Sequence, residues 1–220
     1  EGGEIRLGKI TLSPRNAQAW DPSLRPWLSP QTRQAQALTR AVGDALFQLA
    51  EKGGFADAAL DQSQEFWRRS PAASIARSSI NQIKGMLRAG NWEGAAKTAA
   101  ALIGLGEGLT PSGDDFCLGL LAASHTWDDP DAQAFRVCLG EEVLQNLRRT
   151  NDVSAQYLAC AVEGNFSQLL LKLLSRQNEK EDLVQAALTV GQVGHSSGVD
   201  TLNGLYLGSL FHAASDEPQQ

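Results

Sequence analysis

The chain has 220 residues, of which 42% are hydrophobic and 20% are charged. This length and composition are typical of one globular domain, or of one domain with a small appendage, and they exclude a disordered chain or a coiled coil. The net charge of −6, with no run of Lys and Arg and no stretch of about 18 apolar residues, predicts a protein that binds no nucleic acid and spans no membrane.

The first 30 residues are predicted to form an extended segment with a little β-structure. Between residues 5 and 12, aliphatic side chains alternate with polar ones on either side of Gly8-Lys9, which predicts a short hairpin. Two isolated strands are marginal in water, so we expect this pair to belong to a sheet completed elsewhere. Residues 13–30 contain four prolines and two tryptophans, and they predict an extended connector that lies on the body through its indoles.

After this segment the apolar residues recur at helical spacing. The first helix is predicted to start at Ser29-Pro30, with Pro at the first helical position, and to end at Gly53-Gly54. Further helices are predicted near residues 57–69, 73–89, 91–103, 113–125, 130–149, 153–163, 166–176, 180–190 and 198–213. The predicted fold class is therefore mainly α, with residues 1–30 as a β/extended segment, the remnant of a small β region, and residues 31–220 as a helical domain.

The three cysteines indicate the redox compartment. Cys117, Cys138 and Cys160 are odd in number, and no two are close enough for a C-x-x-C clip. Each lies in an apolar helical pattern, so we expect buried, reduced thiols in a cytoplasmic protein.

Two Gly-rich loops run directly into predicted helices, at residues 104–121 and 191–206. Both contain the pattern Ser-Gly-x-Asp-x-x-x-Gly-Leu, at a constant offset of 85 residues from Ser112 to Ser197. Gly119 and Gly204 fall inside helices, where glycine costs roughly 1 kcal/mol relative to alanine, and this favours a close approach of two helices. We expect the helix starts at Ser112 and Ser197 to be neighbours related by approximate two-fold symmetry, with the two glycines at the crossing.

The paired motifs allow two interpretations. In one, Ser-x-x-Asp is a capping box at each helix start, and the motifs serve helix packing alone. In the other, unpaired amides at the two helix starts, together with nearby hydroxyls, bind a small anion such as phosphate or a carboxylate. The loop residues predicted to bind the anion are Gly106, Gly108, Thr110, Ser112, Gly113, Asp114, Ser196, Ser197 and Gly198.

Three residues of the motifs are candidate catalytic groups. His195 is either a general acid that protonates a leaving nitrogen or a histidine hydrogen-bonded at a helix cap. Asp115 and Asp200, equivalent in the two motifs, either cap amides or orient a substrate, act as a base or hold a cation. Asp114, Asp115, Asp200 and His195 suit a metal by ligand type, but their spacing fixes no three ligands, so no metal and no other cofactor is predicted.

The string Gly-Leu-Gly-x-Gly-Leu-Thr-Pro-Ser-Gly-Asp-Asp-Phe at 104–116 resembles the AllH-like family, as does Gly-His-Ser-Ser-Gly-x-Asp-Thr-Leu-x-Gly at 194–204. Arg149-Thr150, with Ser154, is similar to a further recurrent element, and the resemblance covers roughly residues 90–210. It implies a subunit of oxamate carbamoyltransferase, a transferase of allantoin degradation in purine metabolism. The reaction implied is phosphorolysis of oxalurate to oxamate and carbamoyl phosphate.

The resemblance further implies partners and site residues. The partners are other subunits of the enzyme, one of them similar to acyl-CoA synthetases, and the ligands are small anions: oxalurate, oxamate, phosphate and carbamoyl phosphate. Arg149 and Thr150 join the predicted anion site, although Arg149 equally fits a solvated charge at a helix C-terminus. Family members carry more β-structure at the N-terminus than residues 1–12 supply, so we expect this chain to lack N-terminal residues.

Two other functions remain open at this point. The chain is either a non-catalytic docking subunit of the same complex, or a metal-dependent hydrolase of small amides. The first would leave the loops as contacts for a partner, and the second would require metal ligands to converge at the loops.

Overall fold

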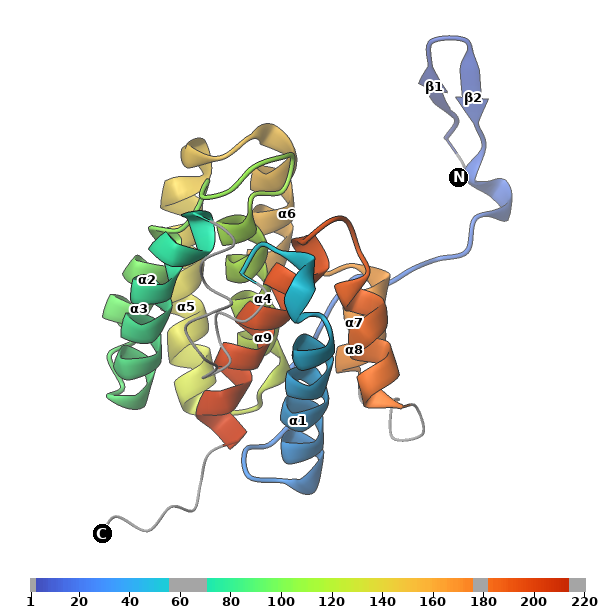
Figure 1. The fold of residues 1–220 in the computed structure, drawn as a ribbon. Coiled ribbons are helices and arrows are strands. Elements are labelled where there is room, and N and C mark those ends of the chain that lie inside the picture. Colours follow the sequence, from blue (N-terminus) through green and yellow to red (C-terminus); the bar gives the residue numbers. More distant parts are fainter. Residues whose placement is uncertain (1–2, 56–70, 176–181, 214–220) are drawn as a thin grey trace, which may run out of the picture.

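The computed structural model describes residues 3–55, 71–175 and 182–213, and these residues form a helical bundle with one small hairpin (Figure 1). The helices are α1 (Arg33–Gln48), α2 (Pro71–Arg88), α3 (Trp92–Ala100), α4 (Ser112–Thr126), α5 (Pro130–Asn146), α6 (Asp152–Val162), α7 (Gln168–Leu174), α8 (Leu183–Gly191) and α9 (Ser197–Ala213). Short 3-10 helices are η1 (Pro14–Asn16), η2 (Ala50–Lys52) and η4 (Leu147–Arg149). The predicted fold class, mainly α, is confirmed; the helix predicted near 57–69 lies outside the described residues.

Local sequence signals explain most helix starts. Besides α1, five helices begin where a side chain accepts a hydrogen bond from an amide of the first turn, which satisfies one of the donors left free at a helix N-terminus. These capping residues are Asn91 for α3, Asp129 for α5, Asn151 for α6, Ser167 for α7 and Asp182 for α8. No helix in the described part of the chain is both long and apolar enough to cross a membrane.

The start of α1 differs from the prediction. Thr32, and not Ser29, caps the helix, since Thr32 Oγ1 accepts a hydrogen bond from the amide of Ala35 at 3.2 Å. Gln31 has a φ of 63°, a left-handed conformation, so Pro30 cannot be the first residue of the helix. Ser29-Pro30 therefore leads into a turn, and the helix starts three residues later than predicted, after Thr32.

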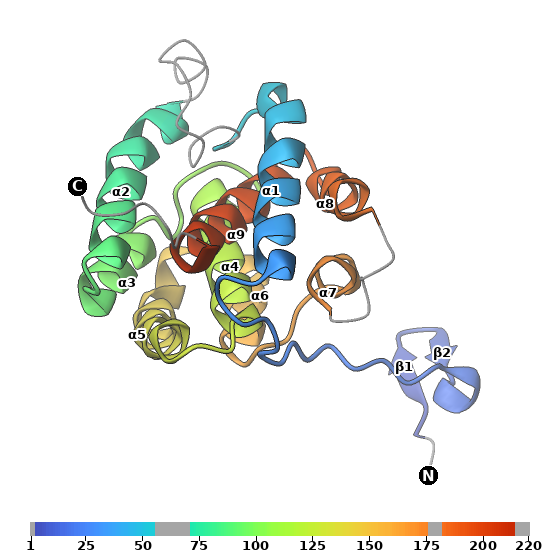
Figure 2. The ribbon, with the colours of Figure 1, turned by 90° about the horizontal axis from the view of Figure 1, so that it is seen from below.

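The N-terminal hairpin is present, and it stands apart from the helical body (Figures 1 and 2). Strands β1 (Ile5–Leu7) and β2 (Ile10–Leu12) pair antiparallel, with Ile5 opposite Leu12 and Leu7 opposite Ile10. These four aliphatic side chains therefore share one face of the hairpin, and all four are exposed. The expected completion of this sheet is not seen within the described residues, where the sheet has two strands.

Part of the predicted connector belongs to the body. The amide of Leu24 donates to the carbonyl of Gly164 at 2.8 Å, and the indole Nε1 of Trp27 donates to the carbonyl of Leu174 at 2.6 Å. The prediction that both indoles lie on the body is right for Trp27, and Trp20, although 56% exposed, lies against the body where it lines the cavity described below. The division of the chain at residue 30 stays a prediction, since these contacts tie earlier residues to the helices.

Helices α4 and α9 cross at the centre of the bundle, with the other helices around them (Figure 2). Most of the described residues of both are buried, which explains why their sequences are apolar on all sides rather than amphipathic. At the crossing Gly119 lies against the carbonyl of Thr201, and Gly204 lies against the carbonyl of Phe116. A Cβ at either glycine would overlap that backbone oxygen, so the predicted crossing at the two glycines is confirmed.

Candidate functional site

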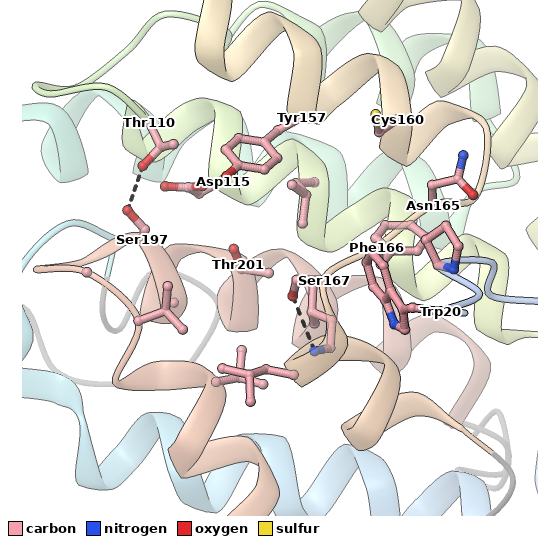
Figure 3. A pocket seen from close by; sticks show the side chains of 18 residues that line it. Trp20, Thr110, Asp115, Tyr157, Cys160, Asn165, Phe166, Ser167, Ser197 and Thr201 are labelled. Carbon is pink, nitrogen blue, oxygen red and sulfur yellow. Dashed lines mark hydrogen bonds between the residues drawn. The ribbon is translucent and has the colours of Figure 1, made fainter. Parts of the chain in front are cut away.

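The starts of α4 and α9 meet, as the repeated motif predicted. Thr110 Oγ1 and Ser197 Oγ lie 2.7 Å apart (Figure 3). The hydroxyl of Ser197 lowers the pKa of Asp115 across the crossing, and the hydroxyl of Ser112 lowers the pKa of Asp200. Each aspartate therefore interacts with the serine of the other motif, which is the reciprocal arrangement that a two-fold axis produces.

The capping-box interpretation is wrong for α4. The N-cap of this helix is Pro111, without a side-chain cap, and Ser112 is already inside the helix. The amides are satisfied by the loops instead: Gly113 N donates to the carbonyl of Leu105 at 2.9 Å, and Gly198 N donates to the carbonyl of Val193 at 3.0 Å. These two amides are engaged within the protein, which removes the donors through which Gly113 and Gly198 were expected to bind an anion.

Asp115 is a buried carboxyl group with an unusual charge state. Its side chain is 7% exposed, and burial raises its pKa to about 8, with the charge of Asp200 acting in the same direction. The hydroxyls of Ser197 and Thr110 lower the pKa and only partly offset these effects. The buried Oδ2 atom has no hydrogen-bond partner among the described residues. Asp115 is therefore mostly protonated at neutral pH and can donate a hydrogen bond or a proton.

Asp200 is placed differently from its equivalent. It is fully buried, and its Oδ1 accepts a hydrogen bond from the amide of Phe55 at 2.5 Å. Burial raises its pKa to about 6, while the amide of Phe55 and the hydroxyls of Ser112 and Ser196 lower it. Gly54 and Phe55 lie against its carboxylate and Asp200 does not line the cavity described below, so it acts on Asp115 through its charge.

Both raised pKa values predict that these two acids make the protein less stable as the pH rises. The folded protein holds protons that the unfolded chain, with pKa values near 3.8, releases. Their stabilising contribution is complete below that value and is lost as the pH rises through about 6 and about 8. Asn at position 115 cannot ionise, so the unfolding free energy of Asp115→Asn, measured by urea titration, should increase relative to that of wild type between about pH 5 and pH 8. Asp44→Asn, at an exposed position on α1, is the control. A difference in unfolding free energy between Asp115→Asn and wild type that stays constant with pH would contradict this prediction.

Asp114, Thr150 and Arg149 hold the Gly-rich loop in place. Asp114 accepts hydrogen bonds from the amide of Gly104, at 2.6 Å, and from the hydroxyl of Thr150. The guanidinium of Arg149 donates to the carbonyl of Ala101 at 2.9 Å, at the C-terminal end of α3. This is the helix C-terminus position that was the alternative for Arg149. All three predicted anion-binding residues have structural partners here, and none lines the cavity described below.

Thr150→Val tests this structural role. The change leaves a carboxylate oxygen of Asp114 in a buried position without its donor, and we expect a loss of about 1–3 kcal/mol of unfolding free energy. Thr150→Ser keeps the hydroxyl and should be close to wild type. The comparison is made by urea unfolding of the two variants, and equal stabilities would show that the Asp114–Thr150 contact contributes nothing.

A cavity of about 590 Å³ opens beside the helix crossing, with walls from α4, α6, α7, α8, α9 and the N-terminal connector. Thr110, Asp115 and Ser197 lie at one end, and Trp20 and Phe166 lie at the other (Figure 3). No Lys or Arg of the described residues lines it. A few polar groups thus converge at one end of a mostly apolar pocket, which is the usual form of a small-molecule site.

The predicted site residues divide into two groups. Those that line the cavity are Thr110, Asp115, Ser197 and Gly198. Those that do not line it are Gly106, Gly108, Ser112, Gly113, Asp114, Arg149, Thr150, His195, Ser196 and Asp200. The structure therefore brings one predicted acid and two hydroxyls together in the cavity wall, and the ten residues named last lie outside that wall.

The remaining loop residues and the candidate metal ligands lie outside the cavity or apart from one another. His195 is exposed in the loop before α9. Gly106 and Gly108 have φ angles of 125° and 91°, conformations that favour glycine. Across the described residues, no three His, Cys, Asp or Glu side chains gather as metal ligands would, so the four candidate ligands do not converge.

Sequence reasoning missed several cavity residues. Thr201 lies one helical turn after Ser197 on the same face of α9, so its place in the wall could have been found from helical spacing. Tyr157, on α6, and Phe166, in the loop after α6, belong to no recognisable sequence motif, so no signal in the sequence indicated that they line the cavity. Phe55, the donor to Asp200, follows Gly53-Gly54, which the sequence analysis treated only as a helix stop.

Comparison with known protein families gives a match over the centre and C-terminal part of the chain, and no solved structure matches the chain. Residues 102–209 match the family model described as oxamate carbamoyltransferase subunit AllH. The matched segment contains both Gly-rich loops, the crossing of α4 and α9, and Asp115 with the two hydroxyls beside it. Through residues 102–209 the chain belongs to the AllH family, as its sequence motifs had indicated.

Proposed function

We propose that this chain is a subunit of oxamate carbamoyltransferase and contributes its substrate site at the starts of α4 and α9. The family description supports the enzyme. One observation of the structure supports the site: the crossing of the two motifs places a protonated Asp115 beside the hydroxyls of Thr110 and Ser197, at the end of a cavity. The proposed reaction is phosphorolysis of oxalurate in allantoin degradation, in the cytoplasm, where the three free cysteines stay reduced.

The side chains at this end suit carbamoyl transfer. An oxygen of hydrogen phosphate forms a bond to the carbamoyl carbon of oxalurate, and the bond from that carbon to the oxamyl nitrogen breaks. The leaving nitrogen takes a proton from Asp115 and departs as oxamate, and the proton of hydrogen phosphate restores Asp115. The hydroxyls of Thr110 and Ser197 share one hydrogen bond, and the hydroxyl that accepts it donates its own proton to the carbonyl oxygen, where negative charge develops in the transition state.

The site needs a positive charge for phosphate, and the described residues supply none to the cavity. We assign that charge to a partner subunit, in line with an enzyme of several subunits. The partner similar to acyl-CoA synthetases, implied by the family resemblance, is a candidate for this role. On this account neither this chain nor its partners turn over oxalurate alone.

The test is reconstitution of the complex from purified subunits. Carbamoyl phosphate formed from oxalurate and phosphate should require this chain and its partners together. Each subunit is omitted in turn, and carbamoyl phosphate is measured through a coupled carbamate kinase. Full activity of the partners without this chain would overturn the proposal.

A docking role without chemistry is the second candidate, and one observation favours it. Trp20, Tyr157 and Val193 line the cavity while remaining 56%, 56% and 46% exposed. Apolar side chains exposed at a cavity are the kind of surface that a partner covers. The two roles differ in one outcome: if this chain only docks, the complex keeps its activity when Asp115 is replaced by Asn.

A further inference from the structure

The cavity is much larger than the ligands of the proposed reaction. Oxalurate has about nine non-hydrogen atoms, and even at the roughly 30 Å³ that one water occupies in the liquid it fills about 270 Å³. The cavity measures about 590 Å³, so more than half of it stays free when oxalurate lies at the Asp115 end. A site shaped for that molecule alone would not need this space.

The walls of the cavity are mostly apolar: Leu118 of α4, Leu169 and Leu170 of α7, and Val190 of α8 line it, together with Phe166. Two polar residues, Asn165 and Ser167, also line it, and both have partners within the protein, since Asn165 donates to Glu163 and Ser167 accepts from the amide of Leu170. Leu170, Val190 and Phe166 are buried, and no Lys or Arg of the described residues reaches the wall. Such a surface favours a hydrocarbon group, which gains free energy on leaving water, and it disfavours a second anion.

The other end holds one built polar position. Asp115 is 7% exposed, lies in the cavity wall, and has a buried Oδ2 without a partner among the described residues. The hydroxyls of Thr110 and Ser197 lie beside it. An unsatisfied buried polar atom costs about 1–3 kcal/mol, and a ligand head group that bonds to it removes this cost.

We propose that the cavity binds a carbonyl compound with a single polar head, a carboxylate, carboxamide or ureide, and an apolar body of about six to ten carbons. The head lies against Asp115, Thr110 and Ser197, and the body extends towards Phe166 and Trp20. This assignment goes beyond carbamoyl transfer from oxalurate and does not depend on it.

A small molecule fits these observations better than a segment of a partner protein. The volume lies within the range of about 300–1,000 Å³ that small-molecule sites occupy, and the polar groups converge at one end. A partner segment in an extended conformation would instead need main-chain acceptors and donors along its path. The walls offer mainly side chains of Leu, Val and Phe, and the polar Asn165 and Ser167 already have hydrogen-bond partners within the protein.

The first test is a chain-length series measured by calorimetry on the purified chain. The probes are acetate, butyrate, hexanoate and octanoate, with hexanamide and octanamide as neutral heads. Affinity should rise about four-fold for each methylene that leaves water. Octanoate should bind more weakly above about pH 8, where Asp115 ionises and repels it, whereas octanamide should not. Affinities that do not depend on chain length, or no binding of octanoate or octanamide, would overturn the proposal.

The second test places the ligand. Cys160 lines the cavity, while Cys138 on α5 is similarly half-buried but does not, so alkylation of the two thiols is compared within one protein. Saturating octanoate should slow alkylation of Cys160 at least ten-fold and leave Cys138 unchanged. A cavity-filling change, Leu169→Trp, should weaken octanoate binding at least ten-fold, whereas Leu144→Trp, exposed on α5, should not.

The outcomes separate this proposal from carbamoyl transfer. Octanoate binding that persists in Leu169→Trp and leaves Cys160 unprotected would overturn the cavity assignment. Protection of Cys160 by a partner subunit, with no binding of octanoate or octanamide, would also overturn it and would identify a protein occupant. Loss of the oxalurate reaction in the reconstituted complex, with octanoate binding intact, would overturn only the proposed function.

Discussion

Gly204→Ala is expected to destabilise the protein by about 3 kcal/mol, a large effect for the addition of one methyl group. The new Cβ would overlap the carbonyl oxygen of Phe116, which is part of the backbone of α4 and cannot turn away as a side chain can. Helices α4 and α9 would have to move apart along their whole buried contact. Gly119→Ala meets the carbonyl of Thr201 in the same way and should have a similar effect.

Gly85→Ala is the matched control for this prediction. Gly85 is also inside a helix, α2, but a Cβ there has no atom within 4 Å. Alanine should therefore stabilise the protein by about 0.5–1 kcal/mol through its better helix propensity. Both changes are measured by urea unfolding, and a Gly204→Ala protein as stable as Gly85→Ala would show that the crossing is not tightly packed.

Asp115→Asn is expected to reduce turnover of the reconstituted complex by about 100-fold or more, the scale of a lost acid–base group. Asn has nearly the same shape and, like the protonated acid, no charge, and it needs no proton to fold, so the melting temperature near neutral pH should rise rather than fall. The substitution should therefore reduce turnover without reducing stability. A variant that keeps wild-type turnover would remove Asp115 from the chemistry and favour the docking role.

Asp114→Asn is the control for Asp115, and the opposite result is expected. The carboxylate of Asp114 accepts from the amide of Gly104 and from Thr150, so the change should cost about 1–3 kcal/mol of stability. Turnover at a temperature where both variants are fully folded should stay near wild type. Equal turnover losses at the two acids would show that the loop acts as a unit and that neither residue has the assigned role.

The sequence allowed the crossing to be predicted because its signal is geometric. Gly119 and Gly204 are costly inside helices, and their constant offset from Ser112 and Ser197 indicated two equivalent helices in contact. The structure shows that contact. The capping-box interpretation is wrong for α4 because Pro111 precedes Ser112 and is itself the N-cap, which places the serine inside the helix.

The different roles of the three aspartates could not be predicted from the motif. Asp115 and Asp200 hold equivalent positions, but the backbone of Phe55, 145 residues before Asp200, covers one of them and not the other. Asp114 has Val199 as its counterpart, which marked it as different but did not reveal Thr150 as its partner. These distinctions depend on contacts between distant segments.

The cavity is the least predictable part of the site. Its walls come from the connector at Trp20, from α4, from the region of Phe166 and from the loop before α9. Most of the apolar residues lie outside the two Gly-rich segments, and those on helices have the spacing of ordinary core positions. Only the packing of these segments reveals that they leave space beside Asp115.

A crystal structure of the reconstituted complex with oxamate tests the central claim most directly, because it shows which subunit holds the substrate. We predict that oxamate lies in this chain, with its polar atoms within hydrogen-bond distance of Asp115, Thr110 and Ser197. Oxamate bound only in another subunit, with the cavity beside Asp115 free of it, would contradict the claim that the crossing of α4 and α9 forms the substrate site.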